Sequence, residues 1–150
     1  MAGVVALLAL VAAGCGEVDL DDPAASRAER TACAALVAAL PDHVSDQAER
    51  ETSGGELGAA WGDPAIVLRC GVGKPAGYDK FAGCQTANGV DWFVPEKMVT
   101  DQDADVVLTT IGRTPSVEIS LPAEYRPPVA AMVDVAAAIK AHTRVVRRCS

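Results

Sequence analysis

Residues 105–121, DVVLTTIGRTPSVEISL, are the stretch that decides the fold class. Residues 105–111 are rich in Val and Thr, and in residues 117–121 apolar side chains alternate with Glu and Ser. Two runs of this kind, separated by a turn at residues 112–115, predict antiparallel strands with one face toward a core and the other toward solvent. We therefore expect a sheet that is built from hairpins.

The sequence before this stretch predicts a second hairpin and a buried strand. Asn88 and Gly89 form a dipeptide typical of the tight type I′ turn, which needs positive φ at both central residues. Residues 65–70 are a short apolar run followed by glycine, a pattern typical of a buried strand. Residues 42–57 and 71–83 are polar or glycine-rich, and we predict loops there.

Helices are predicted at both ends of the domain. Ser26 and Glu29 form a capping box, and apolar residues then recur at helical spacing up to Pro41. Pro127 and Pro128 open a second helix. Its predicted apolar face consists of Val129, Met132, Val133, Ala136 and Ile139. The order of elements predicts an α+β fold: a small antiparallel sheet of about five strands, with an N-terminal and a C-terminal helix packed on one face.

The N-terminal sequence resembles the export signal of bacterial lipoproteins. Small and apolar residues 2–14 end at Cys15, the position at which such a signal is lipidated and cut. No basic residue precedes the run, and a buried apolar helix is the alternative interpretation; the run is shorter than the roughly 20 residues that span a bilayer. We expect a signal peptide over residues 1–14, a flexible tether over residues 15–25 and one α+β domain over residues 26–150.

The cysteine count agrees with export to an oxidising compartment. Once Cys15 carries lipid, four cysteines remain, and an even number predicts two disulfides. Three connectivities are open. We favour Cys33 with Cys70 and Cys84 with Cys149, because Cys33 lies on the apolar stripe of the first helix and so faces the element that this helix covers. The gaps of 37, 14 and 65 residues do not suit a zinc site.

Composition and motifs argue against several classes of function. The chain has 13 basic and 20 acidic residues, a net charge of −7, which disfavours nucleic acid or anionic lipid headgroups as partners. The sequence contains no phosphate-binding loop, nucleophile elbow or zinc-protease helix. We assign no catalytic residue, no metal ligand and no cofactor.

Several segments together resemble one protein family. They are residues 33–41 (CAALVAALP), 60–71 (AWGDPAIVLRCG), 88–93 (NGVDWF), 109–114 (TTIGRT) with 117–122 (VEISLP), and the helix over 133–138. In this order they resemble the actinobacterial DUF3515 proteins. The resemblance implies a secreted protein or lipoprotein of the cell envelope, and it implies no activity.

Six polar and aromatic residues in these segments are candidates for a binding site. They are Trp61, Asp63, Arg69, Asp91, Trp92 and Arg113. In one interpretation the Trp rings belong to the core and the charged residues form ion pairs at strand ends, Arg69 with Asp91 or Arg113 with Asp63. In the other, all six line a shallow groove at one end of the sheet, where Trp stacks on a sugar and Arg binds a carboxylate or phosphate.

Three classes of function remain open. The favoured one is a non-catalytic lipoprotein, anchored at the outer face of the cytoplasmic membrane, that binds a cell-wall component or an envelope protein. The second is a wall-directed hydrolase with paired carboxylates such as Asp63 and Asp91, which would have to lie within about 10 Å of each other. The third is a structural subunit of an envelope complex, which an exposed apolar patch would favour.

Overall fold

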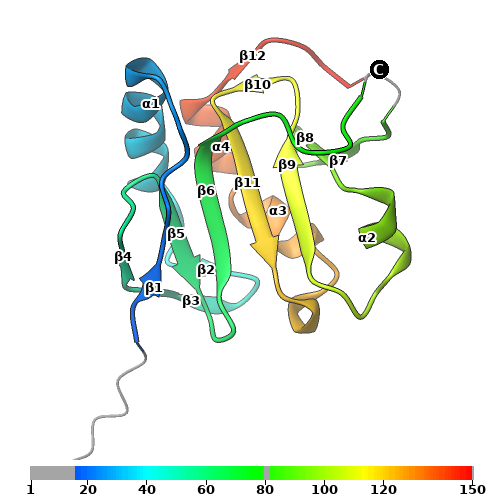
Figure 1. Cartoon of the computed structure of the whole chain (residues 1–150), viewed down its shortest axis with the longest axis horizontal. Helices are drawn as coiled ribbons and strands as arrows, with labels where there is room; N and C mark the ends of the chain where they lie inside the picture. The colour runs from blue at the N-terminus through cyan, green and yellow to red at the C-terminus, as the bar shows by residue number, and fades with distance from the viewer. Residues whose placement is uncertain (1–15, 80–81, 150) are drawn as a thin grey trace, which may run out of the picture.

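The structure is a computed structural model that describes residues 16–79 and 82–149, so the predicted signal peptide and Cys15 lie outside the described residues. Within these ranges, eight strands form one sheet in which every neighbouring pair is antiparallel (Figure 1). In spatial order the strands are β2 (His43–Val44), β3 (Gln47–Arg50), β5 (Gly58–Trp61), β6 (Ile66–Val72), β11 (Ser116–Leu121), β9 (Val106–Thr110), β8 (Val90–Phe93) and β7 (Gln85–Ala87).

Short strand pairs and helices complete the described part of the chain. The pairs are β1 (Val18–Asp19) with β4 (Thr52–Ser53), which is parallel, and β10 (Arg113–Thr114) with β12 (Arg144–Val145), which is antiparallel. The helices are α1 (Arg27–Val37), α2 (Glu96–Thr100), α3 (Val129–Asp134) and α4 (Ala136–His142), with a 3₁₀ turn at Ala123–Tyr125. None of the helices in the described ranges is long and apolar enough to cross a membrane.

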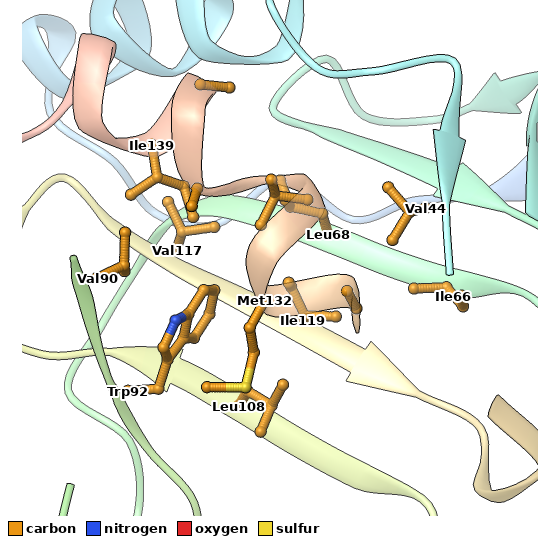
Figure 2. Close-up of a cluster of buried hydrophobic side chains, with 14 of the residues drawn as sticks. Val44, Ile66, Leu68, Val90, Trp92, Leu108, Val117, Ile119, Met132 and Ile139 are labelled. Carbon is orange, nitrogen blue, oxygen red and sulfur yellow. The ribbon is translucent and has the colours of Figure 1, made fainter. Parts of the chain in front are cut away.

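The core lies between one face of the sheet and the helices α1, α3 and α4. Strand β11 alternates as predicted, with every second side chain buried, and its register with β6 and β9 places Ile119 between Leu68 and Leu108. Figure 2 shows these three side chains in one cluster with Met132 of α3 and Ile139 of α4. The α+β class predicted from the sequence is thereby confirmed.

The sheet is larger than the predicted five strands, because the polar segment 42–57 is not a loop. Its residues form β2, β3 and β4, and β5 follows directly. Strands β2 and β3 lie at the edge of the sheet, joined by a turn in which Ser45 and Asp46 both have positive φ. Strand β2 is the edge strand and has one unpaired side, and the side chains of β3 are half-buried or exposed, so the polar sequence of this segment carries little of the usual strand signal.

The N-terminal helix follows its prediction closely. The Glu29 amide donates to Ser26 Oγ, and Glu29 Oε2 accepts from the Ser26 amide, which completes the capping box. Cys33 and Leu36 are fully buried against the sheet. The disulfide between Cys33 and Cys70 joins this helix to β6, with the two Cα atoms 5.4 Å apart.

The C-terminal helix departs from its prediction. It is divided at Val135 into α3 and α4, and Met132, Ala136 and Ile139 are buried as expected. The predicted face is wrong at Val129 and Val133, which are 52% and 43% exposed. The buried side instead includes Ala131, Val135 and Ala138, which together with Met132, Ala136 and Ile139 recur every three or four residues as one helical stripe. Val129 and Val133, one turn apart, lie outside this stripe.

Candidate functional site

Neither tryptophan is available to stack on a ligand. Trp61 and Trp92 are both fully buried among the core residues that face the helices. The Trp61 Nε1 donates to the carbonyl oxygen of Pro41 at 3.0 Å, and Figure 2 shows Trp92 within the apolar cluster. Their large apolar area therefore stabilises the fold instead of forming the wall of a groove.

Arg69 lies on the opposite face of the sheet, which the helices do not cover. It stands directly across from Glu118 on the neighbouring strand, and its Nη2 donates to Glu118 Oε1. The Arg69 side chain is 40% exposed and that of Glu118 17% exposed. The ion pair with Asp91 that the sequence suggested is therefore wrong; the partner is the residue in register on β11.

Asp63 and Asp91 lie at opposite ends of the sheet. Asp63 follows β5 in the turn that leads into β6; its side chain is 77% exposed and its nearest cation is Arg50, at 3.7 Å, instead of Arg113. Asp91 belongs to β8. The next residues of β8 pair with the last residues of β9: Trp92 lies opposite Thr110 and Phe93 opposite Thr109. Thr109 lies opposite Glu118 of β11, and Glu118 lies opposite Arg69 of β6. Asp91 is therefore level with the C-terminal end of β6, whereas Asp63 precedes the N-terminal end of that strand. The two carboxylates do not form a pair across a cleft.

Asp91 and Arg113 are the two candidates that the structure does bring together. Asp91 accepts from Thr86 Oγ1 at 2.7 Å and from the Cys149 amide at 3.1 Å. Arg113, in β10, donates to Thr143 Oγ1 at 3.1 Å and to the Gly89 carbonyl at 3.2 Å. Both side chains are partly buried. The hydrogen bonds to Cys149 and Thr143 attach both residues to the C-terminal part of the chain.

The C-terminal segment crosses this end of the sheet and is attached to it at several points. Strand β12 pairs with β10, and the Gly112 carbonyl accepts from the amides of Val146 and Arg147 at 2.8 and 3.1 Å. Gly112 has a φ of +67°, and a Cβ there would collide with the Arg147 carbonyl. A disulfide between Cys84 and Cys149 then closes the segment onto the loop before β7. The backbone of the segment is thus held in one place.

This attachment brings Arg113 beside three arginines that are close together in the C-terminal sequence. We call the four arginines the basic end: Arg113, Arg144, Arg147 and Arg148. Arg147 donates to the hydroxyl of Tyr78 at 2.6 Å. The exposed guanidinium groups of Arg144 and Arg148 have no hydrogen bond or ion pair within 4.0 Å to any residue that the structure describes, so their donors face solvent. Guanidinium groups in this state suit a carboxylate or phosphate.

The electrostatics of the basic end agree with its contacts. Burial would raise the pKa of Asp91, but hydrogen bonds from Thr86 and Cys149 and the charges of Arg148 and Arg113 together outweigh it, so the pKa lies below its usual value. Burial lowers the pKa of Arg113, although it stays charged at neutral pH. Asp91 thus offsets part of the positive charge and leaves this end net basic.

A shallow groove of about 790 Å³ begins beside Arg144 and runs between α1 and the end of α4. Its lining is mostly small, with Ala28, Ala32 and Ala35 from α1 and the half-buried His142 from α4. A second hollow of about 750 Å³ lies between the loop after β6 and α2, against Phe93 and Val94. In the described ranges, no three His, Cys, Asp or Glu side chains are grouped as a metal site would need.

Comparison with known proteins identifies a family for this chain. A family model described as "Protein of unknown function (DUF3515)" covers residues 1–147 of the 150-residue chain. No curated protein and no solved structure matches the chain.

Proposed function

Because the chain belongs to the DUF3515 family, whose description assigns no activity, we propose a function from its own residues. In this proposal the protein is an exported domain that is anchored by lipid on Cys15 to the outer face of the cytoplasmic membrane. It binds an anionic cell-wall component or an envelope protein through the basic end, and it does not catalyse a reaction.

The observation that carries the proposal is the pairing of the cysteines. The structure joins Cys33 to Cys70 and Cys84 to Cys149. Of the five cysteines in the sequence, only Cys15 is then left with a thiol, and it is the residue that ends the apolar N-terminal run. Disulfides are compatible with an extracytoplasmic protein. Lipidation needs a free thiol on the cysteine that follows the apolar run, and the disulfide pairing leaves Cys15 with one.

The basic end supports a binding function, because its charge contrasts with that of the whole chain. Arg144 and Arg148 are exposed, and neither has a hydrogen bond or an ion pair within 4.0 Å to another residue that the structure describes, although the net charge of the chain is −7. The disulfide and the Gly112 contacts hold the backbone of this segment before any ligand arrives. A preformed surface loses less conformational entropy on binding, which favours affinity.

A second candidate function is that of a structural subunit. Val129 and Val133, one helical turn apart on α3, are 52% and 43% exposed, and Val145 and Val146 of the C-terminal segment are 42% and 59% exposed. Exposed aliphatic side chains of this kind are used in contacts with other proteins. The hydrolase alternative has weaker support, since Asp63 and Asp91 lie at opposite ends of the sheet.

The anchor is tested with Cys15→Ala. We expect the variant to leave the membrane fraction of the producing cell or to accumulate as an uncleaved precursor, because one thiol carries the whole attachment. Cys84→Ala with Cys149→Ala is the matched control: it also removes cysteines but should remain in the membrane fraction. A correctly cleaved Cys15→Ala protein that still fractionates with membranes would reject the lipoprotein proposal.

The binding surface is tested by chemical cross-linking in envelope membranes. Arg144→Ser with Arg148→Ser should lose the cross-linked product of the wild-type protein, because two exposed guanidinium groups of the basic end are removed. Arg27→Ser with Lys97→Ser is the control, since it removes the same charge from exposed positions elsewhere. If both double variants lose the product equally, general charge and not the basic end is responsible; if only Val133→Glu loses it, the structural-subunit function is favoured.

A further inference from the structure

The segment that was predicted to be a flexible tether packs onto the domain from its first described residue. The amides of Val18 and Leu20 donate to the carbonyls of Glu51 and Ser53 at 2.9 and 2.8 Å, which makes β1 a parallel partner of β4. Leu20 is only 4% exposed. Residues 16–25 therefore belong to the fold and do not hang free between the domain and the membrane.

The domain is shaped to receive this segment. Asp22 Oδ1 accepts from the amides of Glu56 and Leu57, both at 2.8 Å, in the turn before β5. A Cβ at Gly55 would lie 2.7 Å from the same oxygen and 2.9 Å from the Leu20 carbonyl oxygen, closer than real Cβ contacts allow. The close approach of the two backbones thus depends on glycine in a turn more than 30 residues away from the segment.

Arg50 holds the very beginning of the segment. This side chain of β3 is 16% exposed; its Nη2 donates to the Gly16 carbonyl and its Nη1 donates to the Gly62 carbonyl at 3.0 Å. The same guanidinium lies 3.7 Å from Asp63. We call Arg50 with the Gly16 and Gly62 carbonyls the anchor clamp. It ties the residue that follows Cys15 to the turn between β5 and β6.

We infer that the lipid anchor of this protein has no flexible tether, so that the end of the sheet with the anchor clamp lies directly against the lipid bilayer. The inference rests on the proposed lipidation of Cys15. Because Cys15 is bonded to Gly16, one Cα–Cα step of about 3.8 Å separates the lipidated residue from the clamp, whereas ten free residues would reach about 35 Å.

The attachment also fixes which end of the molecule faces outward. Strand β6 runs from the turn beside the clamp to Val72, whose partner on β11 is Ser116, and Arg113 precedes Ser116 by three residues. Figure 1 shows β1 at the lower edge of the molecule, with β10 and β12 at the upper edge. The basic end therefore points away from the bilayer, toward the cell wall.

The experiment uses the chain from Cys15 to Ser150 with both disulfides formed, in which Cys15 is the single thiol. This thiol is coupled to a maleimide phospholipid in phosphatidylcholine vesicles that carry a dansyl headgroup lipid, and energy transfer from the two buried tryptophans reports the distance to the bilayer. Neutral lipid avoids repulsion of the exposed Glu17 and Asp63. The comparison protein has about ten Gly and Ser residues inserted between Cys15 and Gly16, which adds up to about 35 Å of reach and leaves the fold unchanged.

We expect strong energy transfer in the wild-type chain and a clear loss in the insertion variant. Amide hydrogens of Val18 and Leu20 should exchange at least about tenfold more slowly than in an unfolded chain. Arg50→Lys should accelerate this exchange, because one ammonium group does not span both carbonyls as the guanidinium does, and Arg27→Lys should not.

Equal energy transfer in the two proteins, or exchange of Val18 and Leu20 at the rate of an unfolded chain, would overturn the inference. Since the lipid is coupled chemically, both results are independent of whether cells lipidate Cys15. Failure of the proposed function would appear in the fractionation of Cys15→Ala or in the cross-linking of the arginine variants, and failure of the present inference only in the vesicle and exchange measurements.

Discussion

The two arginines of the candidate set differ in what they hold. Arg113 connects the β7–β8 turn, through Gly89, to the end of α4, through Thr143. Among the described residues, Arg69 forms an ion pair with Glu118, on the open face of the sheet. Arg69 is the chain neighbour of the buried Cys70, but alternation along β6 points the Arg69 side chain outward.

We predict that Arg113→Ala lowers the free energy of unfolding by about 2 kcal/mol, since charged hydrogen bonds between separate elements are lost. Arg69→Ala should cost less than about 1 kcal/mol, the usual range for a solvent-screened ion pair. Urea unfolding measures both. Arg113→Lys is the control, because it keeps the positive charge but one ammonium group does not bridge Thr143 and Gly89 as the guanidinium does. A larger loss for Arg69→Ala than for Arg113→Ala would contradict this assignment.

Asp91 makes the C-terminal segment sensitive to acid. Its pKa lies below the usual value in the folded state, so its carboxylate stabilises the fold above the unfolded pKa of about 3.9, and this contribution is lost as the pH falls through the folded pKa. We predict that Asp91→Asn is less stable than the wild type at pH 7 and that the difference shrinks below about pH 4. Thermal unfolding across this pH range gives the difference, and Asp63→Asn, at an exposed site, should show little. If the difference in stability between the two proteins grew toward low pH, the folded state would instead favour the protonated form of Asp91.

At the scale of elements, the Cys33–Cys70 disulfide attaches α1 to the centre of the sheet. Closing a span of 37 residues restricts the unfolded chain, and loop-closure entropy gives about 4 kcal/mol for this length. We predict that Cys33→Ala with Cys70→Ala lowers the free energy of unfolding by about that amount, measured in urea, while α1 keeps its capping box. A loss below about 1 kcal/mol would show that packing of Leu36 and its neighbours already fixes the helix without the covalent link.

Elements with a strong local signal were predictable from the sequence. Asn88 and Gly89 have φ values of 46° and 79°, as the type I′ turn requires. The predicted capping box of Ser26 and Glu29 is present at the start of α1. The strands that were missed lack such a signal. Gly58–Trp61 contains no β-branched residue, and Gln47–Arg50 is polar, so backbone pairing with the neighbouring strands, and not side-chain propensity, makes them strands.

The candidate site could be predicted less well, because it is assembled from distant parts of the chain. Arg113 and Asp91 are among the six candidates from the family-like segments, but the C-terminal residues that lie beside them are brought in by a disulfide of sequence separation 65. The direction in which each Trp points depends on which face of the sheet is covered, and the sequence pattern around Trp61 does not contain that information.

At the scale of the whole molecule, the sheet ends on both sides in very short strands. The outermost strands, β2 and β7, have two and three residues, whereas the central β6 and β11 have seven and six. The proposed lipid anchor would confine the protein to a plane, where copies meet far more often than in free solution. Little unpaired backbone is then offered for one copy to extend the sheet of the next, so the molecule can be crowded at a surface without polymerising edge to edge.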